Sequence, residues 1–271
     1  MFIKDFTETV AKIQSAIREY VIKNNIQSLI VGVSGGIDSA LCCALLWPLC
    51  KELGIELIGR SLPFKTNKMD EVWRAKNVGE AFCTNFKEIS LFDTVHSTMS
   101  LFINLSEDDP TENLIDKKIR NGNIMARLRM IYLYDVARAN KGLVVSTDNK
   151  TERMLGFWTL HGDVGDIVPL HDLWKSEVYL LSMFLVDTLK NAGFEKQSTA
   201  LENCITAVPT DGLGVCEGGD LVQFGEISYE DVDLKIILHM EGEDNNISER
   251  VKSSEFKRNN PLPILVKEVS Q

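Results

Sequence analysis

Along the first half of the chain, segments with the hydrophobic pattern of a β-strand alternate with segments whose apolar residues recur at helical spacing. Residues 28–33 form a short apolar run rich in β-branched side chains, which predicts a buried strand. Apolar residues recur at helical spacing over residues 3–24, which predicts an amphipathic helix that packs on the sheet or on a second subunit. A further helix is expected over residues 37–52, although Pro48 should kink it or end its first segment.

The same alternation continues to about residue 146. It predicts strands at 55–62, 86–90 and 143–146, helices at 69–82, 92–104 and 124–140, and a mobile polar loop at 105–120. Strands that alternate with helices indicate an α/β fold with a doubly wound, mostly parallel sheet and helices on both faces. Ligands of such sheets bind at the carboxyl ends of the strands.

The pattern changes after residue 150. It predicts a short helix at 151–157, a Gly- and Asp-rich loop at 158–169, a helix at 175–191, a loop-rich stretch at 195–226, two short helices at 228–240 and 248–256, and an irregular tail after Lys257. There is no internal repeat and no low-complexity tract, and residues 1–271 are expected to form one domain.

Composition narrows the class of protein. The chain is 44% hydrophobic and 25% charged, which is typical of a globular protein, and its net charge of -10 argues against a nucleic-acid-coating surface. The six cysteines form no C-x-x-C pair, which favours free thiols in a reducing cytosol over a metal cluster. The longest apolar run, residues 40–50, is too short to span a bilayer, and the first residues lack the pattern of a signal peptide. A cytoplasmic protein without membrane or nucleic-acid partners is expected.

The segment from Gly32 to Ser39 carries the strongest chemical signal. Its sequence, Gly-Val-Ser-Gly-Gly-Ile-Asp-Ser, joins the first strand to the next helix through a small-residue turn. Loop amides and a helix N-terminus then point at one spot, which makes an anion site. The loop lacks the lysine of the usual phosphate loop and the G-x-G-x-x-G dinucleotide fingerprint. It resembles instead the pyrophosphate loop of the ATP pyrophosphatases, which cleave ATP between the α and β phosphates to adenylate a substrate; an ordinary strand-turn-helix junction would also explain the pattern.

Two arginines stand in the segment Asn121 to Met130. Asn123 can cap the helix that follows it, and Arg127 and Arg129 leave that helix in different directions. One of them would reach a ligand while the other holds a carboxylate, or each makes a surface salt bridge.

Carboxylates follow the strand at 143–146. Asp148 is a helix-capping candidate, and Glu152 lies in the first helical turn, where a carboxylate favours the helix dipole. Alternatively, Glu152 and Asp38 converge on Mg²⁺, which prefers carboxylates together with phosphate oxygens. Asp163 and Asp166 lie in a glycine-rich loop and serve equally well as turn residues.

Taken in order, these motifs resemble one family, the ammonia-dependent NAD synthetases. The matching segments are Ser-Gly-Gly-Ile-Asp-Ser at 34–39, Gly-Asn-Ile-Met-Ala-Arg-Leu-Arg-Met at 122–130, Ser-Thr-Asp-Asn-Lys-Thr-Glu at 146–152, Gly-Phe-Trp-Thr at 156–159, Gly-Asp-Ile-Val-Pro-Leu at 165–170, Lys175, Val-Pro-Thr at 208–210, Ile-Ser-Tyr-Glu-Asp-Val-Asp at 227–233 and Glu-Phe-Lys-Arg at 255–258. The resemblance covers nearly the whole chain and implies the adenine nucleotide α-hydrolase-like fold.

The resemblance also implies an activity. The family amidates nicotinic acid adenine dinucleotide with ammonia to give NAD, through an acyl-adenylate, and releases AMP and pyrophosphate. By resemblance, ATP would be bound by Gly32, Val33, Ser34, Gly35, Gly36, Ile37, Asp38, Ser39, Thr147, Lys175 and Thr210, the dinucleotide by Arg127, Asp166, Phe256 and Lys257, and Mg²⁺ by Asp38 and Glu152. Asp38 and Lys175 would be the catalytic residues. The family works as a homodimer, and the N-terminal helix is a plausible part of that interface.

Three departures from the family pattern fall on the side of the acid substrate. Leu160 replaces a usual lysine, Gly-Asp-Val-Gly-Asp at 162–166 is one residue shorter than the family's loop, and Phe256 replaces the histidine of a His-Lys pair. The acceptor could therefore be the mononucleotide or another nicotinate-like carboxylate. The residues are also compatible with a different ATP pyrophosphatase, such as a tRNA-modifying enzyme, and with a catalytically degenerate ATP-binding protein.

The nitrogen source is predicted from what the sequence lacks. It shows neither an N-terminal nucleophilic cysteine nor a second domain long enough for a glutaminase. Free ammonia, or a separate glutaminase partner, is expected.

Overall fold

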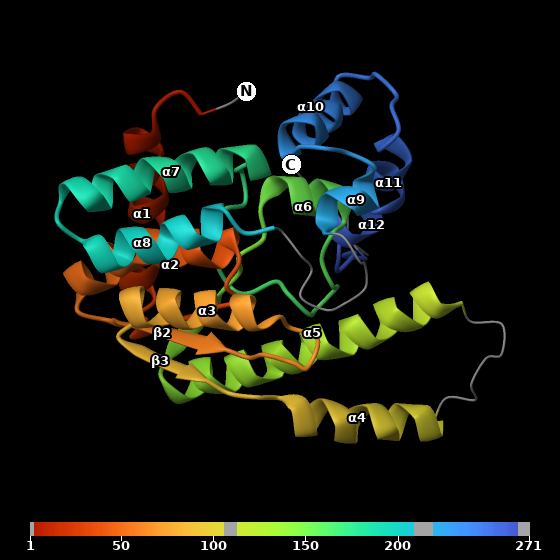
Figure 1. Cartoon of the computed structure of the whole chain (residues 1–271), viewed down its shortest axis with the longest axis horizontal. Coiled ribbons are helices and arrows are strands. Elements are labelled where there is room, and N and C mark those ends of the chain that lie inside the picture. Colours follow the sequence, from red (N-terminus) through yellow and green to blue (C-terminus); the bar gives the residue numbers. More distant parts are fainter. Residues whose placement is uncertain (1–2, 106–112, 209–218, 265–271) are drawn as a thin grey trace.

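A parallel sheet lies at the centre of the fold in the computed structural model, which describes residues 3–105, 113–208 and 219–264 (Figure 1). The strands are β1 (Ser28–Gly32), β2 (Glu56–Ser61), β3 (Asn85–Glu88) and β4 (Gly142–Val145). The helices are α1 (Phe6–Lys23), α2 (Ile37–Leu53), α3 (Met69–Phe82), α4 (Phe92–Leu105), α5 (Leu114–Ala139), α6 (Lys150–Leu155), α7 (Lys175–Asn191), α8 (Glu195–Ile205), α9 (Asp220–Phe224), α10 (Tyr229–Met240), α11 (Ser248–Ser253) and α12 (Glu255–Arg258).

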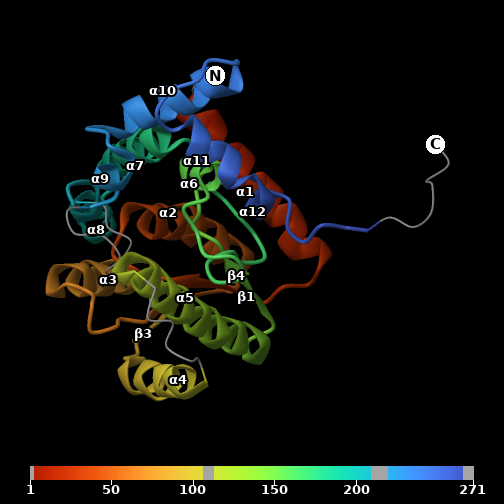
Figure 2. The same cartoon turned by 90° about the vertical axis from the view of Figure 1, so that its right-hand side faces the viewer.

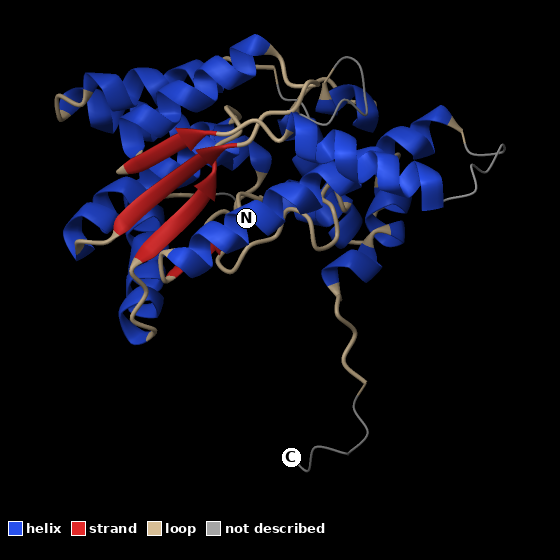
Figure 3. Ribbon diagram, turned by 90° about the horizontal axis from the view of Figure 1, so that it is seen from below, coloured by secondary structure: helices blue, strands red, loops and turns tan. Residues whose placement is uncertain are grey.

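The sheet has the predicted parallel arrangement. Within the described residues its strand order is β3-β2-β1-β4, and every neighbouring pair is parallel. Leu29 of β1 stands opposite Leu57 of β2 and Leu143 of β4. The carboxyl ends of the strands therefore meet at one edge of the sheet, as the arrowheads in Figure 3 show.

Helices cover both faces of the sheet. Successive residues of a strand point to opposite faces, so each strand contributes side chains to two cores. Leu29 and Val31 pack in one core with α1, α2, α3, α7 and α8, whereas Ile30 packs in a second core with α4 and α5. The α/β prediction is confirmed. The apolar stripe of α1 packs within its own chain, since Phe6 stacks on Phe184 of α7 with ring centroids 5.6 Å apart.

Helix α5 begins earlier than predicted. The sequence suggested a loop at 105–120, but the helix starts at Leu114. The side chain of Asn113 accepts hydrogen bonds from the backbone N–H groups of Ile115 and Asp116, and this cap starts the helix in a polar stretch. The rest of that expected loop, residues 106–112, lies outside the described residues.

Two further differences concern helices. Residues 195–205 form α8, although the sequence suggested loop from 195 to 226, because Ala200, Leu201 and Cys204 give it a buried face. Helix α2 runs through Pro48 to Leu53. Pro48 has no N–H group, so it cannot donate a helical hydrogen bond to the preceding turn. The side chain of Gln14 donates to a carbonyl of that turn, the one of Leu45, at 2.8 Å.

The C-terminal helices form a separate small core beside α6. Leu155, Trp174, Tyr229, Val232 and Ile236 are buried together, and α11 and α12 lie against α6 (Figure 2). The helix predicted at 248–256 is divided at Ser254 into α11 and α12. Among the helices of the described ranges, none is long and apolar enough to cross a membrane.

Candidate active site

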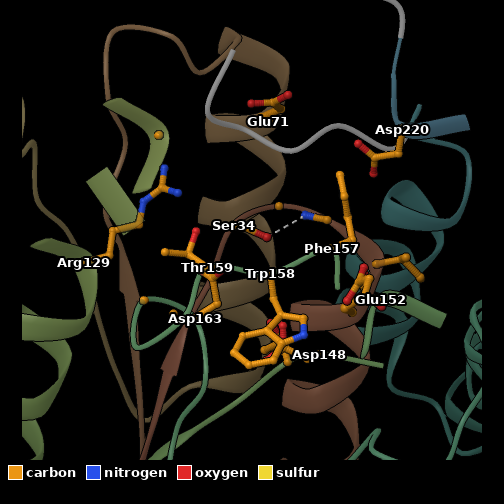
Figure 4. A pocket seen from close by; sticks show the side chains of 18 of the residues that line it. Ser34, Glu71, Arg129, Asp148, Glu152, Phe157, Trp158, Thr159, Asp163 and Asp220 are labelled. Atoms are coloured by element: carbon orange, nitrogen blue, oxygen red, sulfur yellow. Dashed lines mark hydrogen bonds between the residues drawn. The ribbon is translucent and has the colours of Figure 1, made fainter. Parts of the chain in front are cut away.

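A cavity of about 790 Å³ opens at the carboxyl edge of the sheet. Residues 32–38 after β1, Leu62 and Pro63 after β2, and Thr147 and Asp148 after β4 line it. Glu152, Lys175 and residues of the 156–163 segment also line it, together with residues of α3, α5 and the C-terminal helices, and Figure 4 shows several of the lining side chains around the hollow. Segments distant in sequence therefore meet where an α/β sheet usually binds its ligand.

The loop between β1 and α2 is held by its own serines. The Ser39 hydroxyl accepts a hydrogen bond from the Ser34 backbone N–H at 3.2 Å and donates to the Gly36 carbonyl at 3.1 Å. The Ser34 hydroxyl accepts from the Gly36 N–H at 3.2 Å. Gly36 begins α2 without a side-chain cap, so the first N–H groups of that helix remain available to an anion.

Helix α3 presses against this loop at Gly35. Gly35 has φ +85°, and a Cβ there would lie 2.2 Å from the carbonyl oxygen of Glu71 and 2.9 Å from the nitrogen of Ala75. Arg74 donates from Nε to the Gly35 carbonyl at 3.0 Å and pairs with Asp70 at 2.8 Å. Only glycine fits this contact, and Arg74 fixes the loop in that position.

A lysine and two carboxylates meet beside the loop. Lys175, 2% exposed, donates to Asp38 and to Glu152 Oε1, the latter at 3.2 Å. Asn149 donates to the other oxygen of Asp38 at 2.9 Å. Burial alone would lower the pKa of Lys175, but Asp38 and Glu152 outweigh it and raise that pKa well above its ordinary value, so the lysine is charged.

Glu152 is presented by a capping box at the start of α6. The side chain of Asn149 accepts from the Glu152 N–H at 3.0 Å, and the Glu152 carboxylate accepts from the Asn149 N–H at 3.3 Å. The N-cap is therefore Asn149 and not Asp148. Because Asn149 also binds Asp38, one residue starts the helix and joins both carboxylates.

Several carboxyl groups line the cavity close to Lys175. Burial raises the pKa of Glu152, with Asp38 adding to the effect and Lys175 opposing it. Burial, together with Asp163 and Asp38, raises the pKa of Asp148 to about 7. Carboxylate oxygens on Asp38 and Glu152 are the donors that Mg²⁺ prefers, but among the described residues no three metal-binding side chains are grouped to hold an ion. The chemistry of this donor pair fits a magnesium ion, which Asp38 and Glu152 would hold.

The segment 156–163 is tied to α5 on one side. Thr159 donates from its hydroxyl to Asn123 at 2.8 Å, and its N–H donates to Asp163 at 2.5 Å. Arg127 donates to the Leu160 carbonyl from Nε at 3.3 Å and from Nη2 at 3.1 Å. Burial raises the pKa of Asp163.

Arg129 ties α5 to the segment after β2. It donates to the Leu62 carbonyl and to Asn67 Oδ1, both at 3.2 Å, and its guanidinium lies 4.3 Å from the centre of the Phe64 ring. Burial lowers its pKa to about 10, which leaves it protonated at neutral pH. Both arginines thus bind backbone carbonyls, and Arg129 also binds the Asn67 side chain, whereas the sequence suggested a ligand or a carboxylate.

The C-terminal helices supply three cations that hold the end of α6; we call them the C-terminal clamp. Arg258 donates to the Met154 carbonyl at 2.7 Å, and Arg250 donates to the Leu155 carbonyl at 3.2 Å. Lys257 donates to the carbonyls of Gly156 at 2.7 Å and Trp158 at 2.6 Å. Cations at a helix C-terminus satisfy its free carbonyls and its dipole.

The structure brings most of the sequence-predicted ATP and metal residues together. The cavity is lined by Gly32, Val33, Ser34, Gly35, Gly36, Ile37, Asp38, Thr147, Glu152 and Lys175. Ser39 supports the loop from behind, and Thr210 lies outside the described residues.

The predicted acid-substrate residues are more scattered. Lys257 lines the cavity, but Arg127, Asp166 and Phe256 are not among its lining residues. Asp166 accepts from the Val144 N–H at 2.8 Å and from Tyr134 at 3.2 Å. Sequence reasoning missed Arg60, Arg74 and Trp158, which also line the cavity; Arg74 at helical spacing from Asp70 was the available signal.

Comparisons with known proteins agree on one family. The model of the family described as NAD synthase matches residues 9–261. The chain is 30% identical over 264 residues to an NH(3)-dependent NAD(+) synthetase of Pyrococcus furiosus, covering 93% of each chain, and 31% identical to one of Chlorobium phaeobacteroides, covering 81% of this chain and 69% of the relative.

Solved structures show the same fold. An NMN synthetase from Francisella tularensis superposes with a TM-score of 0.75 at 24% identity, covering 98% of this chain and 99% of that chain. An NH3-dependent NAD synthetase from Campylobacter jejuni has a TM-score of 0.68 at 25% identity, covering 97% and 100%.

Proposed function

Because the chain belongs to the NAD synthase family, we propose that it amidates nicotinic acid adenine dinucleotide with ammonia at the expense of ATP. The products are NAD, AMP and pyrophosphate. The observation that carries the proposal is the meeting of the 32–38 loop with Asp38, Lys175 and Glu152 in one cavity. A different ATP pyrophosphatase and a degenerate ATP-binding protein, which the sequence also allows, would form different products.

The chemistry proceeds in two balanced steps. A carboxylate oxygen of the nicotinate attacks the α phosphorus of ATP, the α–β P–O bond breaks, and pyrophosphate leaves with the electron pair. Ammonia then attacks the acyl carbon of the adenylate, AMP leaves, and the nitrogen loses a proton. Charge develops on phosphate oxygens in the first step, where the Lys175 ammonium and the amides at the start of α2 stabilise it.

Magnesium belongs to this proposal as the cation that accompanies ATP. Asp38 and Glu152 would hold it, and when bound it supplies further electrostatic stabilisation of phosphate charge. The protein's own residues bind the phosphates through the loop amides and orient them through Lys175.

The test is an incubation of the protein with ATP, Mg²⁺, ammonium and the acid dinucleotide, analysed by chromatography. NAD and AMP formed in equal amounts, and only with ammonium present, are the expected result. Lys175→Gln should lower kcat roughly 100-fold or more. Lys190→Gln is the matched control, since Lys190 lies on the same helix and pairs at 3.1 Å with Glu202 on the surface. ATP binding without any turnover would refute the proposal and favour the degenerate binder.

A second acceptor, the mononucleotide, is favoured by the acid side of the site. The family pattern assigns Arg127, Asp166 and Phe256 to the dinucleotide, yet none of them lines the cavity, and Asp166 is engaged by the protein itself. Leu160 and Phe256 stand where the family has charged or basic side chains. Side-by-side steady-state kinetics on both acids decide the matter, because a higher kcat/KM for the dinucleotide would reject the mononucleotide.

Three further features belong to the proposal. The nitrogen donor is free ammonia, or ammonia from a separate glutaminase, so glutamine alone should give no product. The active form is a homodimer, which light scattering on the eluting protein would show directly. A cytoplasmic location is supported by Cys42, Cys43, Cys50, Cys83 and Cys204, all of which are free thiols.

A further inference from the structure

Asp233 of α10 carries a fully buried carboxylate that joins the first turns of two other helices. It is 0% exposed. Its Oδ2 accepts from the Ser176 N–H at 2.9 Å and from the Ser176 hydroxyl at 2.6 Å, and its Oδ1 accepts from the Thr151 hydroxyl. Thr151 lies in the first turn of α6 and Ser176 in the first turn of α7. Burial raises the pKa of Asp233, and the hydrogen bonds from Ser176 and Thr151 at these two helix N-termini oppose that rise.

The two residues that Asp233 binds are the chain neighbours of Glu152 and Lys175. Thr151 precedes Glu152, and Ser176 follows Lys175. The Thr151 hydroxyl also accepts from the Lys175 N–H at 2.8 Å. Asp233, Thr151 and the Lys175 backbone therefore form one continuous hydrogen-bonded chain.

The same helix also faces the Lys175 ammonium. Tyr229 lies one turn before Asp233 on α10, and the Lys175 Nζ stands 5.5 Å from the centre of its ring. Helix α10 thus reaches the Lys175 backbone through the Thr151 hydroxyl and faces the charged end of Lys175 through the Tyr229 ring. The segment 227–233 stands out in the sequence, and the ATP, metal and acid-substrate assignments use none of its residues.

We propose that Asp233 is a positioning residue for the adenylation step. By joining the N-termini of α6 and α7, it sets Glu152 and Lys175 at the separation from which both meet Asp38. It touches no substrate, and it acts through Thr151 and Ser176. The inference rests on the proposed function, because its effect on the reaction passes through Lys175.

Asp233→Asn tests this with almost no change of shape. The carboxylate accepts from three donors, whereas an amide must place an N–H group at one of the two oxygen positions. If the amide NH₂ faces Thr151, the Thr151 hydroxyl loses its acceptor. If it faces Ser176, the N–H and the hydroxyl of Ser176 both lose their acceptor. Either arrangement shifts the first turn of α6 or α7.

The expected result is a fall in kcat of about tenfold with the KM values for ATP and the acid substrate within about twofold, because the substrates bind but the lysine is displaced. Asp231→Asn is the matched control on the same helix and should keep wild-type kcat, since the Asp231 carboxylate accepts from the Ser228 hydroxyl at 2.7 Å, within the first turn of α10. A kcat for Asp233→Asn equal to wild type would overturn the inference. A wild-type protein that makes no NAD or nicotinamide mononucleotide would refute the proposed function and this inference with it.

A second pair of variants keeps Asp233 and guards against misfolding. Thr151→Val removes the hydroxyl at constant volume, whereas Thr151→Ser retains it. Thr151→Val should lower kcat by about tenfold and Thr151→Ser should restore at least half of the wild-type value. Equal kcat in the two variants would also overturn the inference.

Discussion

Gly35→Ala should cost the protein much more stability than a glycine replacement at another left-handed position. At Gly35 the new Cβ would stand 2.2 Å from a backbone oxygen of α3 and 2.9 Å from a backbone nitrogen. Backbone atoms cannot rotate away, so α3 or the loop must move by about an ångström. Gly54 has φ +66° and open space around its Cβ position, which makes Gly54→Ala the matched control.

The two costs can be separated. Placing alanine at positive φ costs about 1 kcal/mol at either site. Forcing a methyl group into packed backbone adds about 2 kcal/mol, so Gly35→Ala should lose about 3 kcal/mol of unfolding free energy and Gly54→Ala about 1 kcal/mol. Because the shifted loop also misplaces its amides, ATP should bind roughly tenfold more weakly to Gly35→Ala and with unchanged affinity to Gly54→Ala.

Urea unfolding measures the first effect and titration calorimetry with ATP the second. Gly35→Ala unfolding free energy within about 0.5 kcal/mol of Gly54→Ala would refute the steric reasoning. Unchanged ATP affinity despite the stability loss would refute the role of the loop in holding phosphate.

Three other predictions concern the walls of the site. Burial raises the pKa of Asp148 from 3.8 to about 7, so the folded state holds this proton more tightly and the unfolding free energy should fall by about 3 kcal/mol as pH rises from 4 to 7. Asp148→Asn should reduce the pH slope measured in urea titrations by that amount, while Glu152 and Asp163, whose pKa values burial also raises, retain the remainder; an unchanged slope would contradict the assignment. Arg258→Gln should cost about 2 kcal/mol of stability, because its bonds to the Met154 and Val251 carbonyls are lost; Lys252→Gln, on the exposed side, is the control. Chelation by EDTA should stop NAD formation, and Mg²⁺ should restore it, whereas activity unaffected by EDTA would exclude the proposed metal pair.

The sequence predicted the part of the site that consecutive residues build. A strand, a glycine turn and a helix start are consecutive in the 32–39 segment, and the backbone amides of such a segment make an anion site. Glu152 was placed correctly in the first turn of a helix for the same reason, although the residue that caps this helix is Asn149 and not the predicted Asp148. Lys175 lies alone in its segment, and only the order of motifs in the family pointed to it.

The remainder depends on contacts between distant segments. The sequence shows four basic residues at 250–258, but the partners of Arg250, Lys257 and Arg258 are backbone carbonyls, which every residue possesses and no pattern distinguishes. The family pattern assigns Lys257 to the substrate, and in the structure its ammonium binds two of those carbonyls. Helix α8 was missed because glycines and Pro209 downstream dominated the composition of the stretch, while its buried face needed α7 as a partner.

The C-terminal clamp has a consequence for the newly made protein. A ribosome releases the β1 loop and Asp38 early, and α6 with Glu152 near the middle of the chain, whereas Arg250, Lys257 and Arg258 emerge about a hundred residues later. A nascent chain that lacks them carries a nucleotide loop and a lysine but has no fixed end to the helix that presents Glu152. Since contacts of such wide sequence separation form late in folding, we expect the end of α6 to be fixed only after Arg258 has docked.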